Sequence, residues 1–336
     1  VSEYVKHLQK GLKRRMNDAK LHLLRSDGGL ASAKAAENSP VNLLMSGPAG
    51  GVSGAIWIAQ QAGYENLSTF DMGGTSTDVS LVKNGRAAQS RETTVGDVTV
   101  RASSLDVRTV GAGGGSIAHV PELTGALRVG PQSAGAEPGP AAYGKGGTEP
   151  TVTDANVVLG YMPSDVRLGG DMKLRKDLAQ DAVKTIGDSL GLSLDAAAAG
   201  IYDIVNETMY GALRLVSVEK GYDPRDFALI GFGGAGPLHA NALGKLTNSW
   251  PVIIPPGPGV LCAYGDVTTA IQDEASMSFI RRFSDTNKKE VVQIFTDLAK
   301  KASKTLDAEG VAKKNRTTTY QVDIRYHGQG LLLTID

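Results

Sequence analysis

The apolar and polar positions in the first part of the chain predict a helix, a short strand and then a pair of strands. Residues 1–20 have a helical period, and "LHLLRSDGGL" predicts a strand that enters a turn. "NLLMSGPAGGVSGAIWIAQQAG" predicts a strand, a glycine turn and a helix from Val52 to about Ala62. "LSTFDM" and "DVSLVKNG" predict two strands around "GGTST", and Asn84-Gly85 indicates a hairpin into a further strand.

Glycine and proline are frequent between about Val98 and Tyr161, and hydrophobic periodicity is weak there. Such a composition excludes a long helix or a central strand. It leaves two interpretations, an unstructured linker or ordered loops. Apolar stretches within the segment, such as Val152–Leu159, favour ordered loops that line a site.

Helical periodicity dominates from about Arg175 to Gly221, where Gly221 is a candidate C-terminal cap. "FALIGF" then predicts an apolar strand, and "GGAGPLHANALGKL" predicts a glycine turn and a helix that begins near Pro237. "WPVIIPPGPGV" predicts another buried strand. After about Ile271 a new helix and strands follow, so we expect one domain over residues 1–270 and the beginning of a C-terminal domain over residues 271–336.

Charge and cysteine content narrow the classes of protein. The 336 residues contain 35 basic and 35 acidic side chains, so no net field favours nucleic acid or a membrane surface. No apolar run approaches the roughly 20 residues of a membrane-spanning helix. Cys262 is the only cysteine and is interpreted as a small buried residue. We therefore expect a cytoplasmic protein that binds neither nucleic acid nor membrane.

The two ends of the chain are unusual. It starts at Val1 within a basic helical segment and stops within strand-like alternation at residues 320–336. We therefore expect an internal fragment of a longer protein.

The stretch "FDMGGTSTDVSLV" is the first candidate for chemistry. Its turn has little side-chain bulk, so successive backbone N–H groups can point into a concavity that suits phosphate oxygens. Carboxylates beside a phosphate would repel it unless a cation lies between them, and magnesium commonly takes one or two carboxylates. Asp71 and Asp78 are thus candidate magnesium ligands. An ordinary hairpin with solvated acids is the alternative.

A second glycine turn, "LIGFGGAGPLHA", follows a strand and opens a helix. Gly231, Gly233 and Gly236 match the G-x-G-x-x-G spacing of dinucleotide sites, but that motif expects an acid about 20 residues on. The chain has none there before Asp266, which disfavours a dinucleotide. A nucleotide packed on the glycine backbone, or a turn without a ligand, remains. No nucleophile elbow, H-E-x-x-H motif or Walker A loop is present.

Six motifs in order carry a family resemblance. They are "SGPAGGVSGA", "FDMGGTSTDVSLV", "TVGAGGGSIA", "RVGPQSAGAEPGPAAYGKGGTEPTVTDANVVLGY", "GFGGAGPLHA" and "RYHGQG". Together they resemble the hydantoinase A, 5-oxoprolinase and acetone-carboxylase beta family, and "FDMGGTSTDVSLV" is similar to the second phosphate loop of the actin, hexokinase and Hsp70 superfamily. The resemblance covers most of residues 23–264 and recurs near the C-terminus. No acid–glycine–threonine hairpin of a first phosphate loop occurs before Leu30.

This resemblance implies an α/β fold with actin/Hsp70-like, ribonuclease H-like lobes, in which mixed sheets are flanked by helices, plus the start of a C-terminal α+β region. The first lobe would be truncated. ATP and Mg2+ are the implied cofactors, with Asp71 and Asp78 as catalytic and metal-binding residues. The implied nucleotide-binding residues are Gly73, Gly74, Thr75, Ser76, Thr77, Arg214, Ser217, Gly233, Gly234 and Gly236.

Arg214 and Ser217 are expected on one helix face, because they are three residues apart. Five loop residues are candidates for the substrate end of the site, with loop capping and turn formation as the alternative: Asp106, Ser116, Glu137, Asp154 and Asn156.

The family resemblance implies ATP-dependent hydrolysis of a cyclic amide of the 5-oxoproline or hydantoin type, through phosphorylation of the amide oxygen. The alternatives are an ATP-dependent ketone carboxylase subunit and a non-catalytic nucleotide-binding switch module. The implied partners are a small cyclic amide substrate and a hydantoinase B-type subunit or domain.

Overall fold

The computed structural model describes residues 1–95, 97–165, 167–330 and 332–335, which form two compact units. The larger unit consists of residues 24–28 and 41–269, and the smaller of residues 1–23, 29–40 and 270–336. The larger unit ends at Thr269, next to the predicted domain boundary at 270. Residues 1–23 and 29–40, which were predicted to belong to the first domain, lie instead in the smaller unit together with residues 270–336. The predicted domains, 1–270 and 271–336, therefore stay a prediction.

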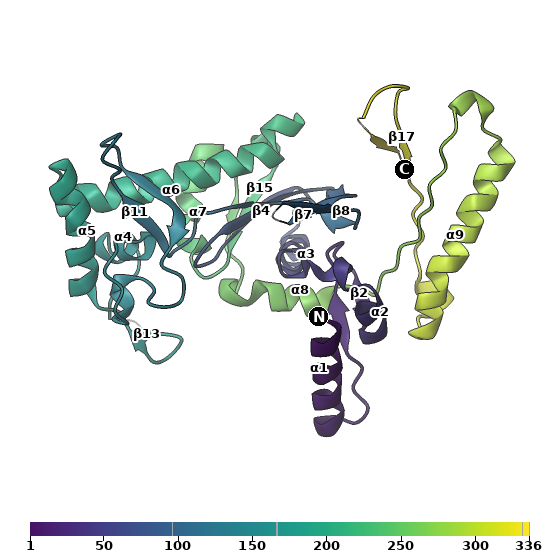
Figure 1. Cartoon of the computed structure of the whole chain (residues 1–336), viewed down its shortest axis with the longest axis horizontal. Coiled ribbons are helices and arrows are strands. Elements are labelled where there is room, and N and C mark those ends of the chain that lie inside the picture. The colour runs from purple at the N-terminus through teal and green to yellow at the C-terminus, as the bar shows by residue number, and fades with distance from the viewer. Residues whose placement is uncertain (96, 166, 331, 336) are drawn as a thin grey trace. The chain divides into compact units, whose positions relative to one another are not determined.

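A six-stranded mixed sheet forms the centre of the larger unit (Figure 1). Its strand order is β10–β4–β3–β15–β16, with β5 paired to β4. β4 runs antiparallel to both β3 and β10, while β15 runs parallel to both β3 and β16. The strands are β3 (Leu67–Met72), β4 (Thr77–Lys83), β5 (Arg86–Ala87), β10 (Val107–Val110), β15 (Ala228–Phe232) and β16 (Val252–Ile253).

Helices cover both faces of this sheet (Figure 1). α6 (Leu194–Val216) and α7 (Gly236–Thr247) pack on one face, and α3 (Ser46–Gln61) packs on the other together with α8 (Leu261–Thr268). Phe70, Val79 and Leu229 belong to the core with residues of α6 and α7. β15 is buried at every position because both of its faces are covered, as is usual for a parallel strand. The fold is thus the expected α/β type, with a mixed sheet flanked by helices.

The rest of the larger unit consists of short strands and two further helices. The helices are α4 (Val152–Val158) and α5 (Lys176–Leu190), which ends at Gly191 in a left-handed cap. The short strands pair locally as β6 (Gln89–Ser90) with β9 (Ser104–Leu105), β7 (Thr93–Val95) with β8 (Val98–Val100), β11 (Ser116–His119) with β12 (Arg128–Ser133), and β13 (Arg167–Leu168) with β14 (Met172–Lys173).

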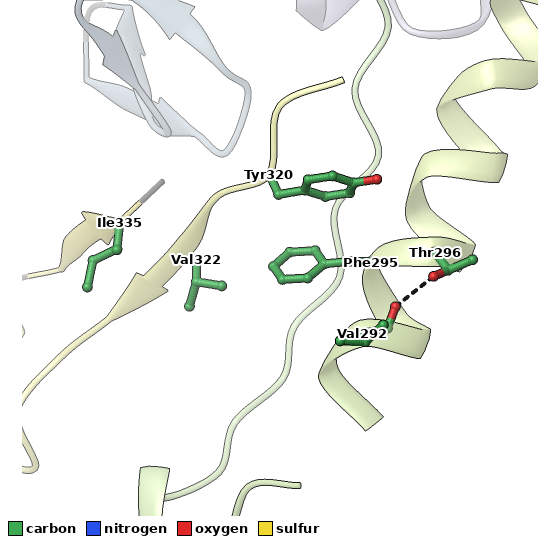
Figure 2. A pocket seen from close by; sticks show the side chains of 6 residues that line it. All are labelled: Val292, Phe295, Thr296, Tyr320, Val322 and Ile335. Atoms are coloured by element: carbon green, nitrogen blue, oxygen red, sulfur yellow. Dashed lines mark hydrogen bonds between the residues drawn. The ribbon is translucent and has the colours of Figure 1, made fainter. Parts of the chain in front are cut away.

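The smaller unit has helices and two-stranded sheets. Its elements are α1 (Ser2–Arg15), β1 (His22–Leu24), β2 (Leu30–Ser32), α2 (Ala33–Asn38), α9 (Lys288–Ala308), β17 (Val322–Ile324) and β18 (Leu333–Ile335). α9 and the β17–β18 hairpin border an apolar cavity of about 440 Å3, into which Phe295, Tyr320 and Val322 project (Figure 2). Leu331 and Asp336, in the strand-like stretch predicted at 320–336, lie outside the described residues.

No helix among the described residues is both long enough and apolar enough to cross a membrane. The cytoplasmic location stays a prediction.

Several predicted elements are confirmed. β3 and β4 are the two strands around "GGTST", and Asn84 and Gly85 join β4 to β5 with positive φ angles of 52° and 70°, as a tight hairpin turn requires. β15 is the predicted "FALIGF" strand, and Pro237 lies in the first turn of α7. Residues 98–161 form short strands and α4 rather than an unstructured linker.

Two predictions were wrong. The segment before α3 is a 3-10 helix (Pro40–Leu43) and not a strand, and α3 begins at Ser46 rather than Val52. The glycines of "SGPAGG" therefore lie inside a helix, where they allow close packing: a β-carbon at Gly51 would lie 2.7 Å from the Phe232 ring. The second error concerns Gly221, which ends a 3-10 turn (Val218–Lys220), because α6 has already ended at Val216.

Candidate functional site

The two glycine turns singled out in the sequence lie side by side at one edge of the central sheet. β3 and β15 are parallel neighbours with Asp71 opposite Phe232, so the chain leaves both strands at the same edge. The turn after β15 packs directly on the end of β3, because Ala235 N–H donates to the Met72 carbonyl (2.9 Å). Gly233, with φ of +83°, has no room for a β-carbon, which would lie 2.5 Å from the Met72 carbonyl oxygen and against Oδ1 of Asp71.

Asp71 and Asp78 form a cross-strand pair. They are directly opposite each other in the β3–β4 register, which places both side chains on the same face of the sheet. Burial, and then the charge of Asp78, raises the pKa of Asp71 above its usual value. Burial also raises the pKa of Asp78, although the Thr109 hydroxyl donates to its Oδ1 (2.5 Å) and opposes the shift. No cation of the described residues acts on the pKa of either carboxylate.

Three segments surround the Asp71 carboxylate. Gly51 of α3 and Gly233 approach it closely, and the Cys262 thiol of α8 lies 3.6 Å from its Oδ2. Burial, together with the charge of Asp71, raises the pKa of Cys262 to about 12, so the thiol stays protonated and can only be a weak donor. The sequence indicated no partner for Cys262, because its partner is 191 residues away.

The pair of carboxylates fits a divalent cation. Two partly buried acids face each other without a protein cation. Burial raises the pKa of both, and the charge of Asp78 raises that of Asp71 further. The described residues contain no group of three or more His, Cys, Asp or Glu side chains that could hold a metal. A cation here would therefore take one or two carboxylates and complete its coordination with water and phosphate oxygens, which is the habit of magnesium.

The turn between β3 and β4 presents free amide groups. Among the hydrogen bonds of the described residues, none uses the N–H groups of Gly74, Thr75 or Ser76. Gly74 and Thr75 are also exposed. Consecutive unpaired amides at a turn of small residues can bind anionic oxygens.

A second glycine segment, residues 113–115, covers one side of this turn. Gly114 N–H donates to the Gly73 carbonyl (3.0 Å), and Gly115 N–H donates to the Gly74 carbonyl (2.6 Å). A β-carbon at Gly113 would lie 2.6 Å from the Thr75 backbone, so only glycine fits. The sequence did single out the "GAGGGS" run, but its periodicity could not show that the run packs on the hairpin.

The other predicted nucleotide-binding residues near the hairpin differ in their exposure to solvent. Gly234 is exposed and Gly236 is buried at the start of α7, both beside the hairpin. The Thr77 hydroxyl is instead buried and donates to the Ala112 carbonyl (2.6 Å).

The prediction that Arg214 and Ser217 share a helix face was wrong. Ser217 follows the last residue of α6, where it is buried and its hydroxyl donates to the Leu213 carbonyl (2.7 Å). Arg214 is exposed, and its guanidinium lies 5.9 Å from the centre of the Tyr210 ring. The structure therefore does not bring these two side chains together.

The five substrate candidates are not gathered in one place. Asp154 is buried and accepts hydrogen bonds from the N–H groups of Ala142 (2.7 Å) and Thr151 (2.9 Å), in the capping box of α4. Ser116 accepts from Gly113 N–H (2.8 Å). Both side chains thus perform the capping and turn formation that was the alternative. Glu137 is exposed before a cis proline, and Asn156 is buried beside His239.

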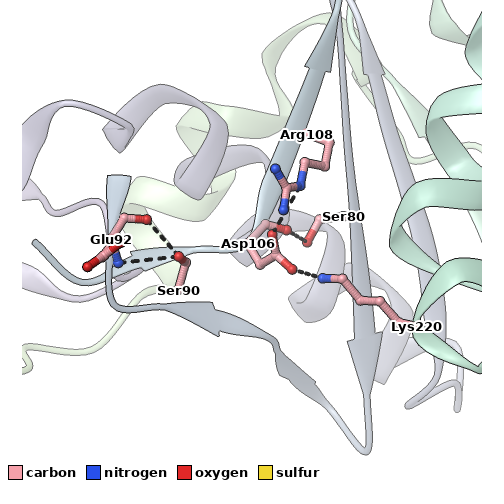
Figure 3. A network of polar contacts seen from close by, with 6 residues as sticks. All are labelled: Ser80, Ser90, Glu92, Asp106, Arg108 and Lys220. Atoms are coloured by element: carbon pink, nitrogen blue, oxygen red, sulfur yellow. Dashed lines mark hydrogen bonds and ion pairs between the residues drawn. The ribbon is translucent and has the colours of Figure 1, made fainter. Parts of the chain in front are cut away.

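Asp106 lies in an ion-pair network of its own (Figure 3). Its carboxylate contacts Lys220, which follows α6, and lies 3.6 Å from the Arg108 guanidinium. Its backbone carbonyl accepts the Ser80 hydroxyl (3.0 Å). Two basic partners therefore already balance the charge of Asp106.

His239 is fully buried in the first turns of α7. Its Nδ1 lies 2.9 Å from the Asn206 side-chain oxygen, its Nε2 lies 3.2 Å from the Asn156 side-chain nitrogen, and its ring stacks on Tyr202. Burial lowers the pKa of His239 to about 4. The ring is therefore neutral at pH 7 and donates through Nδ1 to Asn206.

The pKa of His239 predicts a loss of stability in acid. In the unfolded chain the ring binds a proton near pH 6.5, but in the folded chain it does so only near pH 4. The unfolded state thus binds more protons within this window, so the free energy of unfolding falls as pH falls, by about 3 kcal/mol across the window. Chemical denaturation of the protein and of His239→Gln at pH 7 and pH 4.5 measures the effect.

Because the variant keeps every other titrating group, the difference between the two proteins isolates His239. An identical change of stability with pH in both would contradict the prediction.

Comparison with known proteins provides independent findings. The family model described as hydantoinase/oxoprolinase matches residues 1–275. The chain is 41% identical to caprolactamase subunit alpha of Pseudomonas jessenii, over 91% of this chain and 44% of that protein. It is 37% identical to the acetophenone carboxylase gamma subunit of Aromatoleum aromaticum, over 84% of this chain and 40% of that protein.

Among solved structures, the chain is similar to the crystal structure of the ATP-dependent caprolactamase from Pseudomonas jessenii. The TM-score is 0.88 at 38% identity, and the match covers 99% of this chain and 49% of that one. The chain thus spans about half the length of the relatives it matches.

Proposed function

The chain belongs to the hydantoinase/oxoprolinase family, and from this premise we propose that it contains the nucleotide-binding lobe of an enzyme that uses ATP to open a cyclic amide. The observation that carries the proposal is the contact between the Asp71–Asp78 hairpin and the Gly233–Gly236 turn. Although they are far apart in the chain, they meet at one sheet edge, with Gly233 against the Asp71 carboxylate. A phosphate site and an adenosine site must lie next to each other if they are to bind the two ends of one ATP molecule.

Each part of the site has a distinct task in this proposal. The free amides of residues 74–76 bind phosphate oxygens, and the exposed hydroxyl of Thr75 adds a donor. Gly234 leaves open space for the adenosine to lie against the backbone, while Gly233 and Gly236 let the turn pack closely on the end of β3. Asp71 and Asp78 would hold Mg2+, which would supply charge neutralisation to the transferring phosphoryl group.

ATP is required because an amide carbonyl is a poor electrophile. Transfer of the γ-phosphoryl group to the amide oxygen forms a P–O bond and releases ADP. Water then attacks the activated carbon and the C–N bond breaks, which frees the amine and leaves an acyl phosphate. A second water hydrolyses the acyl phosphate to the carboxylate and inorganic phosphate. Phosphoryl transfer of this kind depends mainly on positioning, which the amides of the hairpin would supply, and on charge stabilisation, which a cation held by the two acids would supply.

The relatives favour a cyclic amide as the substrate class and a second polypeptide as a partner. One relative is a caprolactamase, named as a subunit of its enzyme, and the family description includes oxoprolinase. We therefore propose a small lactam of the 5-oxoproline, caprolactam or hydantoin type as the substrate. A hydantoinase B-type subunit or domain is the proposed partner.

The likeness to the acetophenone carboxylase gamma subunit supports a second candidate, ATP-dependent carboxylation of a ketone. A nucleotide-binding switch without catalysis is the third.

Product analysis with the full-length protein separates these candidates. We expect ADP and phosphate to appear only with a lactam, in equal amounts with the ring-opened amino acid. ADP formation that requires bicarbonate and a ketone would instead establish the carboxylase. ATP consumption independent of any carbonyl compound would leave only the switch module.

A further inference from the structure

A buried polar cluster joins three helices behind the candidate nucleotide site. His239 of α7 is bonded on one side to Asn206 of α6 and on the other to Asn156 of α4. All three side chains are at most 2% exposed, and Tyr202 stacks on the imidazole with 4.8 Å between ring centres. The Asn156 side-chain oxygen has no hydrogen-bond partner among the described residues.

Packing helices through a buried polar cluster is less favourable in free energy than packing them through apolar side chains. Buried amides and imidazoles lose their hydration, and an apolar contact would fill the same space without that cost. A bonded polar network has a different property, because its directional bonds are satisfied in one arrangement only. The cluster therefore fixes the position of α7 relative to α4 and α6 more narrowly than apolar packing would.

Each helix at the ends of this cluster leads to one half of the candidate site. On the α7 side, the Gly233–Gly236 turn precedes His239 directly, and Ala235 N–H is bonded to the Met72 carbonyl. On the α4 side, Thr153 N–H donates to the Gly114 carbonyl (2.7 Å), and Gly114 N–H donates to the Gly73 carbonyl (3.0 Å). A bonded path thus runs from Asn156 through the Gly113–Gly115 segment to the phosphate hairpin.

We propose that His239 is a positioning residue of the nucleotide site. Through α7 and α4, His239 holds the Gly233–Gly236 turn (the adenosine turn) and the Asp71–Asp78 hairpin (the phosphate hairpin) at a fixed separation. This inference rests on the proposed function. His239 is buried and does not contact the nucleotide; it acts on the Gly233–Gly236 turn through its own helix and on residues 73–76 through Asn156.

The test compares His239→Phe with a control in the same core. Phenylalanine keeps the ring on Tyr202 but removes both hydrogen bonds. Val183→Ala removes buried volume from α5, which forms no part of either glycine turn. The full-length protein and both variants are compared for Mg-ATP affinity by titration calorimetry. Amide hydrogen exchange of Gly114, Gly115 and Ala235 is measured without nucleotide.

We expect His239→Phe to weaken Mg-ATP binding by about tenfold or more. A loss of this size is typical when a residue that positions the binding groups, without contacting the ligand itself, is replaced. Exchange at Gly114, Gly115 and Ala235 should accelerate together. Val183→Ala should lower the thermal midpoint but leave both readouts unchanged at temperatures where it is folded. His239→Gln should recover most of the affinity, because its amide offers a donor and an acceptor with a spacing similar to that of the two ring nitrogens.

Three results would overturn the inference, and the last of them differs from the first two because it also overturns the proposed function. If His239→Phe and Val183→Ala change affinity equally, or if exchange accelerates at Ala235 alone, His239 has only a structural role. If the wild-type protein shows no nucleotide binding, the proposed function fails, and this inference fails with it.

Discussion

Asp71→Asn is expected to lower kcat for lactam-dependent ATP hydrolysis by about 100-fold or more. A metal ion supplies several kcal/mol of stabilisation to the charge of the transition state. Each 1.36 kcal/mol corresponds to a factor of ten in rate. An asparagine has the shape of aspartate but lacks its charge, so it would hold magnesium weakly and let the phosphate oxygens shift.

The same substitution should make the nucleotide-free protein more stable. Burial and the charge of Asp78 raise the pKa of Asp71, so the ionised carboxylate is less favourable in the folded chain than in the unfolded one. This group therefore reduces stability above its folded-state pKa, and the reduction disappears as pH falls through that pKa. The asparagine side chain of the Asp71→Asn variant stays neutral at every pH, so we expect a higher thermal midpoint at pH 7.

Asp223→Asn is the matched control. Asp223 is an exposed aspartate that pairs with Arg225, remote from the hairpin along the chain, and Arg225 lowers its pKa to about 2. Its replacement should leave kcat unchanged and should not stabilise the protein. Full activity of Asp71→Asn at saturating Mg-ATP would remove the metal assignment. A lower thermal midpoint would show that the carboxylate has a structural role instead.

Gly233→Ala is expected to abolish nucleotide binding and to destabilise the fold by about 3 kcal/mol. A left-handed φ costs a residue with a side chain about 1–2 kcal/mol, and an extra carbon in a packed site costs about 1–3 kcal/mol. At Gly233 both penalties apply, because φ is +83° and the new carbon would meet Met72 and the Asp71 carboxylate. The adenosine turn would have to move away from β3, and Asp71 would have to rotate.

Gly234→Ala separates stability from binding. A β-carbon at Gly234 would meet no atom within 4 Å, and its φ is not positive. We therefore expect an unchanged free energy of unfolding by chemical denaturation, together with weaker Mg-ATP binding by calorimetry, because the carbon would project into the space proposed for the adenosine. If Gly234→Ala binds the nucleotide normally, the adenosine does not lie on this turn. If Gly233→Ala is as stable as wild type, the close approach to Asp71 is absent in solution.

The local elements near the site could be predicted from the sequence. Apolar stretches on both sides of "GGTST" identified β3 and β4, Asn84-Gly85 identified the hairpin that follows β4, and Gly233 with Pro237 identified the turn before α7. Each of these signals is complete within a few residues, because period, turn geometry and the first turn of a helix depend on local backbone sterics. Six ordered motifs likewise sufficed to identify the family, which the comparisons confirm.

Local signals failed where a residue depends on a distant partner. "SGPAGG" was predicted as a turn, since glycine is typical of turns, yet its glycines lie within α3 and allow contact with Phe232. Ser217 was assigned to a helix face by its spacing, but the α-helix ends one residue earlier. Asp154 was left with two interpretations, and only its bonds to Ala142 and Thr151 showed that it caps α4.

The sequence by itself determined β3, β4 and β15, the turns at Asn84-Gly85 and Gly233, the family and the two acids of the hairpin. Only the tertiary structure decided that β15 pairs with β3 and that Gly233 therefore touches Asp71. It also decided that Cys262 and Gly113 contact the hairpin, and that His239 joins α7 to α6 and α4. The physical reason is that side-chain period specifies which face of an element is buried but not which element buries it. That choice depends on the packing of the whole core, where partners such as Asp71 and Cys262 are 191 residues apart in the chain.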